Sequence, residues 1–471
     1  MYEPQRLHPL AIVDFFIHNI YTLVQALLPL LVIALTEIGS RKWLLLAIPF
    51  LIILFVVYGF LYWLRYVFYI QGQELRLESG VFIRKKRYIP FERIQTIQIT
   101  AGILQCLFGL VKIQVETAGG GAKAEFVLAA LSRQKAEELS RIIHTNKIIC
   151  PTKCEETTPI EYDLSTRSLL LLASTSNGIG VALAALLAVV SQFDDVFSNI
   201  HLWVKLGTYV ENIAAGKISL IILLIFLLLF LAWLMSLLGT LIRFAGFRMV
   251  RDDNNIKISR GLLERQQITI PLRKIQAIKL TEGILRQPLG MVSIQVVSVS
   301  NIGTKGEGNL IVPLLPKAQL ISFMEKTLPE FAMSLQVQGL PRRSKNRYYL
   351  INILPVVILA VLSSIFIPKG YLAFSLLPLA AWLGHQQYQD AGWQAEEHKL
   401  LLRSRGLGRT TTIIHRRRIQ SISVSRSFLQ KRQRINSLAI AFASGIAGAH
   451  VKIRGMDDKK SNTILNWFIQ E

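Results

Sequence analysis

The chain has 471 residues, of which 52% are hydrophobic and 18% charged, and its mean hydropathy is +0.41. This composition is too apolar for an ordinary soluble protein and indicates a membrane protein. The formal net charge of +23 would suit a nucleic-acid partner, but membrane proteins that face an anionic inner leaflet show the same excess, so we expect no nucleic acid. The three cysteines exclude a disulfide framework.

Six apolar stretches, in three pairs, reach or approach the length needed to cross a bilayer: about 18–37, 43–65, 168–191, 217–242, 349–367 and 370–387. The first has no basic region before it and no cleavage site after it, so we expect a retained anchor. The basic residues in or beside the loops within the pairs are Arg41, Lys42, Lys205, Lys217 and Lys369. Because the rest lie on the other side, the positive-inside rule predicts a multi-pass plasma-membrane protein whose polar segments and termini are cytoplasmic.

One pattern recurs in the polar segments. Gly80–Leu110 returns as Gly261–Met291 at an offset of 181 residues, and more loosely as Gly406–Ile435. Alternating apolar residues, as in VKIQVETAG from residue 111, predict half-buried antiparallel strands, and each series ends in a helical segment such as Ser132–Ile143. We therefore expect three modules, each a curled antiparallel sheet closed by a C-terminal helix.

These patterns divide the chain into membrane hairpins, modules and linkers. We place the hairpins at 1–66, 168–243 and 348–388, the modules at 67–150, 244–335 and 389–471, and the linkers at 151–167 and 336–347.

Twelve residues form a recurring motif to which we assign structural roles: Gly80, Pro90, Arg93, Gln95, Gly109, Gly261, Pro271, Lys274, Gln276, Gly290, Gly406 and Gln420. The prolines suit corners because proline cannot donate to a strand ladder. The repeated glutamine predicts an amide that satisfies backbone groups of a turn, with ligand contact as the alternative. Gly109 and Gly290 precede a strand, where a left-handed backbone would select glycine.

The third module departs from this motif. It has His415 in place of the proline, Arg434 in place of the second glycine, and one residue fewer after Gly406. We expect it to keep the fold and to lose the tight turn geometry.

The third module also carries the strongest basic cluster, with Arg416, Arg417, Arg418, Lys431, Arg432 and Arg434. One interpretation is a solvated strand edge, and the other is contact with anionic lipid headgroups or a partner. Cys150, Cys154 and His144 supply only three ligands at no standard spacing, so we expect no metal site and no cofactor.

The paired spans, the I-P-x-x-[RK]-I-Q turn and the L-[QR]-x-x-x-G-[LM] element together resemble the bacterial pleckstrin-homology-like family, also described as the membrane-flanked domain, in three tandem copies. The resemblance implies an α+β membrane protein with six transmembrane α-helices in three hairpins. Each hairpin would be followed by a PH-like, partly open antiparallel β-barrel or sandwich of about seven strands, capped by a C-terminal helix. The resemblance transfers neither a ligand nor catalytic residues.

These observations favour a non-enzymatic scaffold or binding platform at the inner face of the bacterial plasma membrane, with envelope maintenance or resistance to membrane-active agents as candidate processes. The expected partners are anionic membrane lipids and another membrane protein or a second copy of the chain. A transporter or exporter of a lipid or amphipathic peptide is the alternative, although ionisable residues are nearly absent from the spans. An enzyme is not expected, because the sequence has no nucleophile elbow, P-loop or H-E-x-x-H helix.

Overall fold

The structure is a computed structural model. It describes residues 4–12, 16, 41–117, 126–145, 160–175, 184, 218–252, 254–298, 310–366, 370–443 and 449–469. The first apolar stretch, the glycines 119–121, Cys150 and Cys154 lie outside the described residues.

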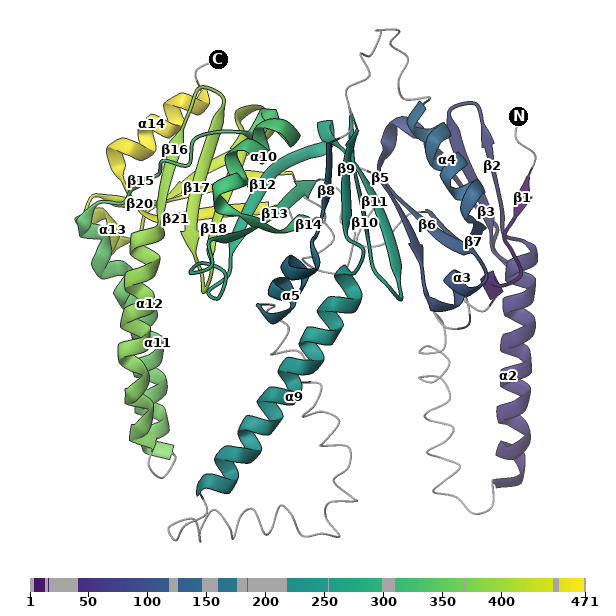
Figure 1. The fold of residues 1–471 in the computed structure, drawn as a ribbon, viewed down its shortest axis with the longest axis horizontal. Helices are drawn as coiled ribbons and strands as arrows, with labels where there is room; N and C mark the ends of the chain where they lie inside the picture. Colours follow the sequence, from purple (N-terminus) through teal and green to yellow (C-terminus); the bar gives the residue numbers. More distant parts are fainter. Residues whose placement is uncertain are drawn as a thin grey trace.

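Each polar segment contributes to a module of seven antiparallel strands and a closing helix (Figure 1). Module 1 comprises β1 (Gln5–Arg6), β2 (Val67–Gln71), β3 (Glu74–Ser79), β4 (Lys85–Pro90), β5 (Ile94–Ala101), β6 (Leu110–Thr117), β7 (Phe126–Ser132) and α4 (Arg133–Thr145). Module 2 comprises β8 (Ile160–Asp163), β9 (Arg248–Asp252), β10 (Asn255–Arg260), β11 (Arg265–Pro271), β12 (Ile275–Glu282), β13 (Met291–Ser298), β14 (Leu310–Pro316) and α10 (Leu320–Thr327). Module 3 comprises β15 (Gln338–Gly339), β16 (Gly392–Ala395), β17 (Lys399–Arg405), β18 (Arg409–His415), β19 (Ile419–Ser425), β20 (Ile435–Phe442), β21 (Ala449–Asp457) and α14 (Asp458–Ile469).

The apolar and polar residues that alternate along these strands lie on opposite faces of each sheet. In β3 the side chains of Leu75 and Leu77 are buried, while their neighbours are partly exposed. Because successive strand residues point to opposite faces, one face of each strand enters the module core. The order of strands followed by a helix confirms the predicted module.

Apolar helices are inserted between the first and second strands of each module. β1 pairs with β2, β8 with β9 and β15 with β16, although the chain between each pair contains apolar helices. The segments 151–167 and 336–347, which we placed as linkers, therefore contain strands of modules 2 and 3. Both ends of each inserted apolar segment are thereby held in one sheet.

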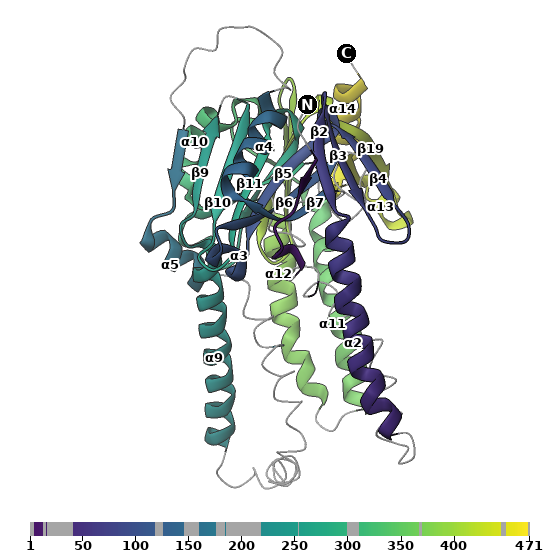
Figure 2. The ribbon, with the colours of Figure 1, turned by 90° about the vertical axis from the view of Figure 1, so that its right-hand side faces the viewer.

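Four long helices extend from the same side of the modules, as Figures 1 and 2 both show. They are α2 (Arg41–Leu64), α9 (Ile218–Phe244), α11 (Lys345–Phe366) and α12 (Leu377–Asp390), and a shorter helix, α5 (Thr166–Ser174), packs against α9. Within the described residues, two helical stretches are long and apolar enough to cross a membrane, Phe226–Phe244 and Arg342–Phe366. Two of the six predicted spans therefore meet this test.

The other predicted spans differ in detail. The span at 43–65 is helical as α2. The span at 370–387 begins as a 3₁₀ segment, Gly370–Leu376, so the α-helix that follows has 14 residues. For the span at 168–191, α5 covers the start, and most of the remainder lies outside the described residues.

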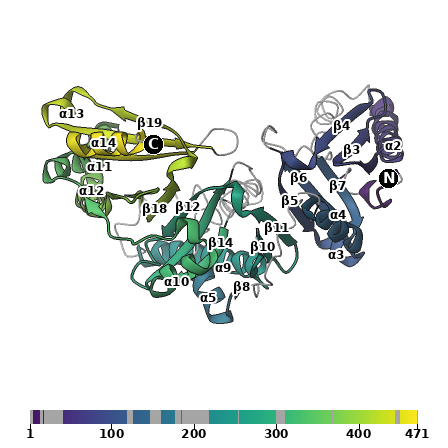
Figure 3. The same cartoon turned by 90° about the horizontal axis from the view of Figure 1, so that it is seen from above.

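The modules share their sheets. β5 of module 1 pairs with β11 of module 2, and β12 of module 2 pairs with β18 of module 3. Two continuous seven-stranded sheets result, in the orders β7-β6-β5-β11-β10-β9-β8 and β14-β13-β12-β18-β17-β16-β15. The core of module 2 accordingly includes Leu401 and Ile413 from module 3. Figure 3 shows the three modules following one another along a curve.

The recurring glutamine marks a β-bulge in every module. The ladder register shifts between Ile94 and Thr96, between Ile275 and Ala277, and between Ile419 and Ser421, so the extra residue is Gln95, Gln276 or Gln420. The Gln276 side chain donates to the backbone oxygen of Lys274 at 3.2 Å. A bulge bends the strand away from its partner, so the motif residue lies where each sheet turns.

The prediction that module 3 loses its tight turns is wrong at Arg434. Gly109 and Gly290 have φ angles of +66° and +63°, and Arg434 has +52°. All three residues lie directly before a strand. In module 1 the residue follows the short helix α3 (Ile103–Leu107), and in module 3 it follows the short helix α13 (Phe428–Arg432). The left-handed turn is therefore kept, with a non-glycine residue in a conformation that is less favourable for it.

The alignment of Gly406 with Gly261 is also corrected by strand register. The ladder between β17 and β18 extends one residue pair further than the ladder between β10 and β11. Its last pair is Arg405 and Arg409, and the chain reverses over Gly406–Gly408. Arg405 thus takes the register position of Gly261. The two hairpins contain the same number of residues, so no deletion is needed.

Candidate functional site

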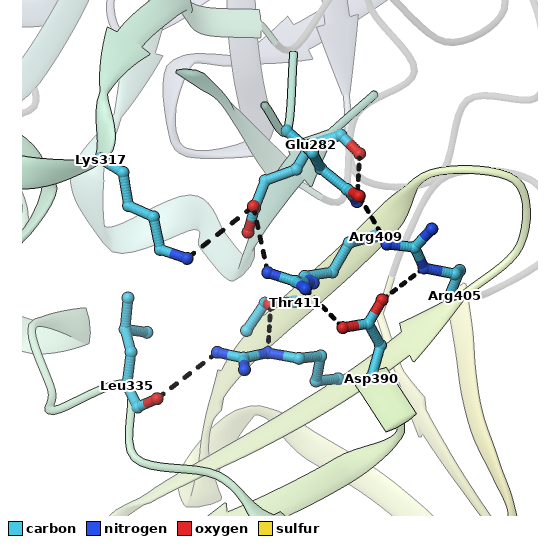
Figure 4. A network of polar contacts seen from close by, with 9 residues as sticks. Glu282, Lys317, Leu335, Asp390, Arg405, Arg409 and Thr411 are labelled. Carbon is cyan, nitrogen blue, oxygen red and sulfur yellow. Dashed lines mark hydrogen bonds and ion pairs between the residues drawn. The ribbon is translucent and has the colours of Figure 1, made fainter. Parts of the chain in front are cut away.

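The junction between modules 2 and 3 is held by a network of ionic side chains (Figure 4). Asp390, at the end of α12, accepts hydrogen bonds from Arg405 and from Arg409, the latter at 2.5 Å. Arg409 also pairs with Glu282 of module 2 at 3.3 Å, and Lys317 lies 3.9 Å from the same carboxylate. The network therefore joins α12 to two modules.

Burial makes this network sensitive to any unmatched charge. The side chains of Arg405 and Asp390 are 5% and 8% exposed. Arg405 also donates to Gln287 of module 2 at 2.5 Å. Removing one member of a buried ion pair leaves its partner uncompensated in a poorly solvated site, which costs more than the pair itself contributes.

The junction between modules 1 and 2 uses the same strand register with different residues. Arg265 lies opposite Ala101, just as Arg409 lies opposite Glu282. β9 pairs with β10 in the same register in which β16 pairs with β17. Gly246 of module 2 therefore takes the position that Asp390 has in module 3. Both carboxylates of the second junction are thus replaced by residues without charge in the first.

The three modules form a row, in which module 1 pairs with module 2 and module 2 pairs with module 3. At each end of this row lies a strand that is equivalent to the strands that pair at the junctions. β4 is the counterpart of β11 and β18, and β19 is the counterpart of β5 and β12; both form the last strand of their sheets. The side chains of Lys85, Lys86, Arg87 and Tyr88 are exposed, whereas the matching residues of β18 are largely buried. Among the described strands, the edge-forming surfaces within the row are therefore buried by pairing, and those at its ends are exposed.

The structure separates the predicted basic cluster into two groups. Gln387 of α12 donates to the backbone oxygen of Gly406 at 3.3 Å, so the β17–β18 turn lies beside α12. β18 runs from that end to Arg416–Arg418, where Arg416 donates to Phe468 of α14 at 3.2 Å. β19 then returns to α13, which carries Lys431 and Arg432. In Figure 1, α13 lies toward the membrane helices and α14 lies away from them.

The turns that follow β11 and β18 have perturbed titrating groups. Burial lowers the pKa of Lys274, and the neighbouring charges of Arg273 and Arg418 lower it further. Burial and then His398 lower the pKa of His415, and the two imidazole rings stack at 6.0 Å. Neutral His415 accepts a backbone hydrogen bond from Arg417 at 3.3 Å. His415 thus caps the turn that proline begins in modules 1 and 2.

The remaining motif residues occupy turns. Pro90 and Pro271 immediately precede the 3₁₀ turns that contain Arg93 and Lys274. Arg93 is exposed. Within the described residues, no group of three histidine, cysteine or acidic side chains could hold a metal ion.

Sequence analysis did not identify the residues of the junction network. Glu282, Asp390, Arg405 and Arg409 are isolated in sequence and match no motif. One signal was available, since Glu282 aligns with Ala101 at the repeat offset of 181 residues. The first two modules are close copies, and this position changes from alanine in module 1 to glutamate in module 2. Such a change indicates a contact that only the second copy makes.

Comparisons with known proteins agree with the architecture. The family model described as "Bacterial PH domain" matches residues 22–147, 179–328 and 349–471, so the chain belongs to the bacterial PH domain family in three copies. The chain is also similar to "UPF0699 transmembrane protein YdbT" of Bacillus subtilis (strain 168). The two are 34% identical over 492 residues, which cover 100% of this chain and 99% of the relative. The name of that relative supports membrane association.

Proposed function

We propose that this protein is a non-enzymatic scaffold at the inner face of the plasma membrane, anchored by six spans with its modules and termini in the cytoplasm. The observation that carries the proposal is the pairing of the modules into a continuous row whose ends expose β4 and β19. Strand addition to a free edge is a common mode of protein recognition. The basic residues that flank the spans on the module side support the orientation.

The charge on β4 favours a different protein over a second copy of the chain. In the register of both junctions, self-pairing would place Arg426 opposite Arg84. Like charges directly opposite each other destabilise a strand pair, although Asp458 partly neutralises Arg426 at 2.7 Å. A partner strand with carboxylates would instead match the basic residues 84–87. We therefore propose an acidic edge strand of another protein as the occupant of β4.

Cross-linking in cells tests both the edge and the orientation. Lys86 is changed to cysteine in a background where Cys106, Cys150 and Cys154 are serine. A membrane-permeant maleimide that carries a photoactivatable benzophenone should then bond to the thiol at position 86 and, on irradiation, insert into a C–H bond of a partner, which produces a larger species on a denaturing gel. A sulfonated, impermeant reagent added to intact cells should produce none.

Gln267 in β11 is the matched control, because it holds the register position of Lys86 while pairing with β5. The cysteine variant at Gln267 should form no adduct with either reagent. Absence of an adduct at position 86 would contradict a partner at β4. The basic residues of β4 would then serve only to prevent unwanted strand pairing. An adduct with the impermeant reagent would reverse the orientation.

We further propose that the α13 group, defined as Lys431, Arg432 and Arg434, contacts anionic headgroups. Each basic residue near an anionic surface contributes about 1 kcal/mol of attraction, which falls off within a Debye length. Changing the three to glutamate should lower the amount of phosphatidylglycerol that purifies with the protein.

The residues Arg416–Arg418 provide a control with the same change of charge at the opposite end of β19. Their reversal to glutamate should leave the retained phosphatidylglycerol unchanged, as measured by mass spectrometry of the purified protein. Equal loss from both triple variants would indicate a general effect of net charge and would contradict a local contact at α13.

A further inference from the structure

The junction of modules 1 and 2 forms a half-open cavity of about 380 Å³ at the end of α9. Ala245 and Gly246, which directly follow this helix, line it together with Ala101 and Leu262. Leu262 is 63% exposed at the tip of the β10–β11 hairpin. The cavity therefore lies where module 2 meets α9, a helix whose segment Phe226–Phe244 is long and apolar enough to cross a membrane.

Arginines give the cavity a positive wall. Arg260 and Arg265 line it from module 2, and Arg133 lines it from module 1. The Arg260 side chain is buried, lies 5.3 Å above the ring of Phe244 and donates to Gln266 at 3.2 Å. Among the described lining residues the one carboxylate is Glu137, which pairs with Arg133 at 3.0 Å.

Comparison with the second junction shows what this cavity lacks. There, Glu282 and Asp390 both pair with Arg409, so two protein carboxylates lie at the corresponding positions. In the first junction, Ala101 and Gly246 hold those two positions and both line the cavity beside Arg265. The cavity thus occupies the place where a repeat of the same architecture puts two negative charges.

We propose that this cavity binds a phosphate group, which takes the place of the carboxylates of Glu282 and Asp390 in the other junction. The guanidinium group presents a planar fork of donors that matches the oxygens of phosphate in a bidentate arrangement. The apolar walls formed by Ile99, Val111 and Leu262 suit the uncharged part of an amphiphile. Both an anionic phospholipid and a soluble phosphate ester carry this group. The proposal is independent of the α13 group.

Two variants test the site in the purified full-length protein. Arg265→Gln removes the charge that faces Ala101, and Ala101→Glu supplies the carboxylate that the second junction has. Both should weaken phosphate binding by about tenfold or more, because each removes or occupies a charge-assisted contact. Ala101→Glu should keep the melting temperature, since the new carboxylate pairs with Arg265. Arg273→Gln, an equal change of charge at an exposed turn, should bind as the parent does.

Two probes distinguish the sources of the phosphate. Glycerol 3-phosphate is titrated into the detergent-solubilised protein by calorimetry, and phosphatidylglycerol retention is measured by native mass spectrometry. Binding of phosphatidylglycerol alone, with comparable loss in both variants, assigns a lipid headgroup, and binding of glycerol 3-phosphate with the same loss assigns a soluble ester; either supports the site. If the parent binds neither probe, or if Arg265→Gln binds both as the parent does, the proposal is overturned.

Discussion

Replacing Asp390 by asparagine should lower the stability of the protein by about 3 kcal/mol, because the change leaves Arg405 buried without its carboxylate. Arg409 keeps Glu282 at 3.3 Å, so the loss falls mainly on Arg405 and on the link to α12. The melting temperature in detergent should fall by about 3 °C, since the shift is the loss of stability divided by an entropy of unfolding that grows with chain length. Protease should also cut between modules 2 and 3 faster than in the parent, since the network spans that junction.

Asp163→Asn is the matched control. Its carboxylate accepts from Arg248 at 3.1 Å, but both side chains are more than half exposed. Exposed pairs contribute about 0–1 kcal/mol, so the same chemical change there should leave the melting temperature nearly unaltered. Similar losses from the two variants would show that burial at the junction adds nothing, and would contradict the role we assign to the network.

The content of each module could be predicted from sequence because its signals are local. Alternating apolar residues in β3 and β6, glycines at the turns and the helical segment at 132–143 each depend on a few neighbouring residues. The recurring Gln95, Gln276 and Gln420 could be assigned a structural role for the same reason. Their place in a bulge needed the ladder register.

The joining of the modules could not be predicted in this way. A period of two tells which face of a strand is buried, but it does not tell which strand lies along its edge. β12 has its neighbours at β13 and β18, and the second lies more than 120 residues away in sequence. The first strands, such as β15 with two residues, are too short to carry a periodic signal. The insertion of the membrane helices was missed because it depends on those strands.

A large backbone effect is expected at Gly261. Its φ is +106°, and a Cβ there would lie 1.9 Å from the backbone oxygen of Glu264, a contact that cannot persist. Gly261 and Leu262 donate backbone hydrogen bonds to Ala245 at 2.9 Å and Ile242 at 3.0 Å, which dock the hairpin on the end of α9. Gly261→Ala must move this hairpin, so we expect a loss of about 2–3 kcal/mol, measured by thermal unfolding in detergent.

Gly406→Ala is the control that makes this expectation specific. Gly406 looks like the same residue in sequence, but no atom lies within 4 Å of a Cβ built there and its φ is outside the left-handed range. Alanine should therefore be tolerated or slightly stabilising, because it restricts the unfolded chain. Gly80, with φ of +109° and a 2.1 Å contact to Ile83, should respond as Gly261 does. A loss at Gly406 equal to that at Gly261 would restore the sequence alignment and contradict the register that places Arg405 at the position of Gly261.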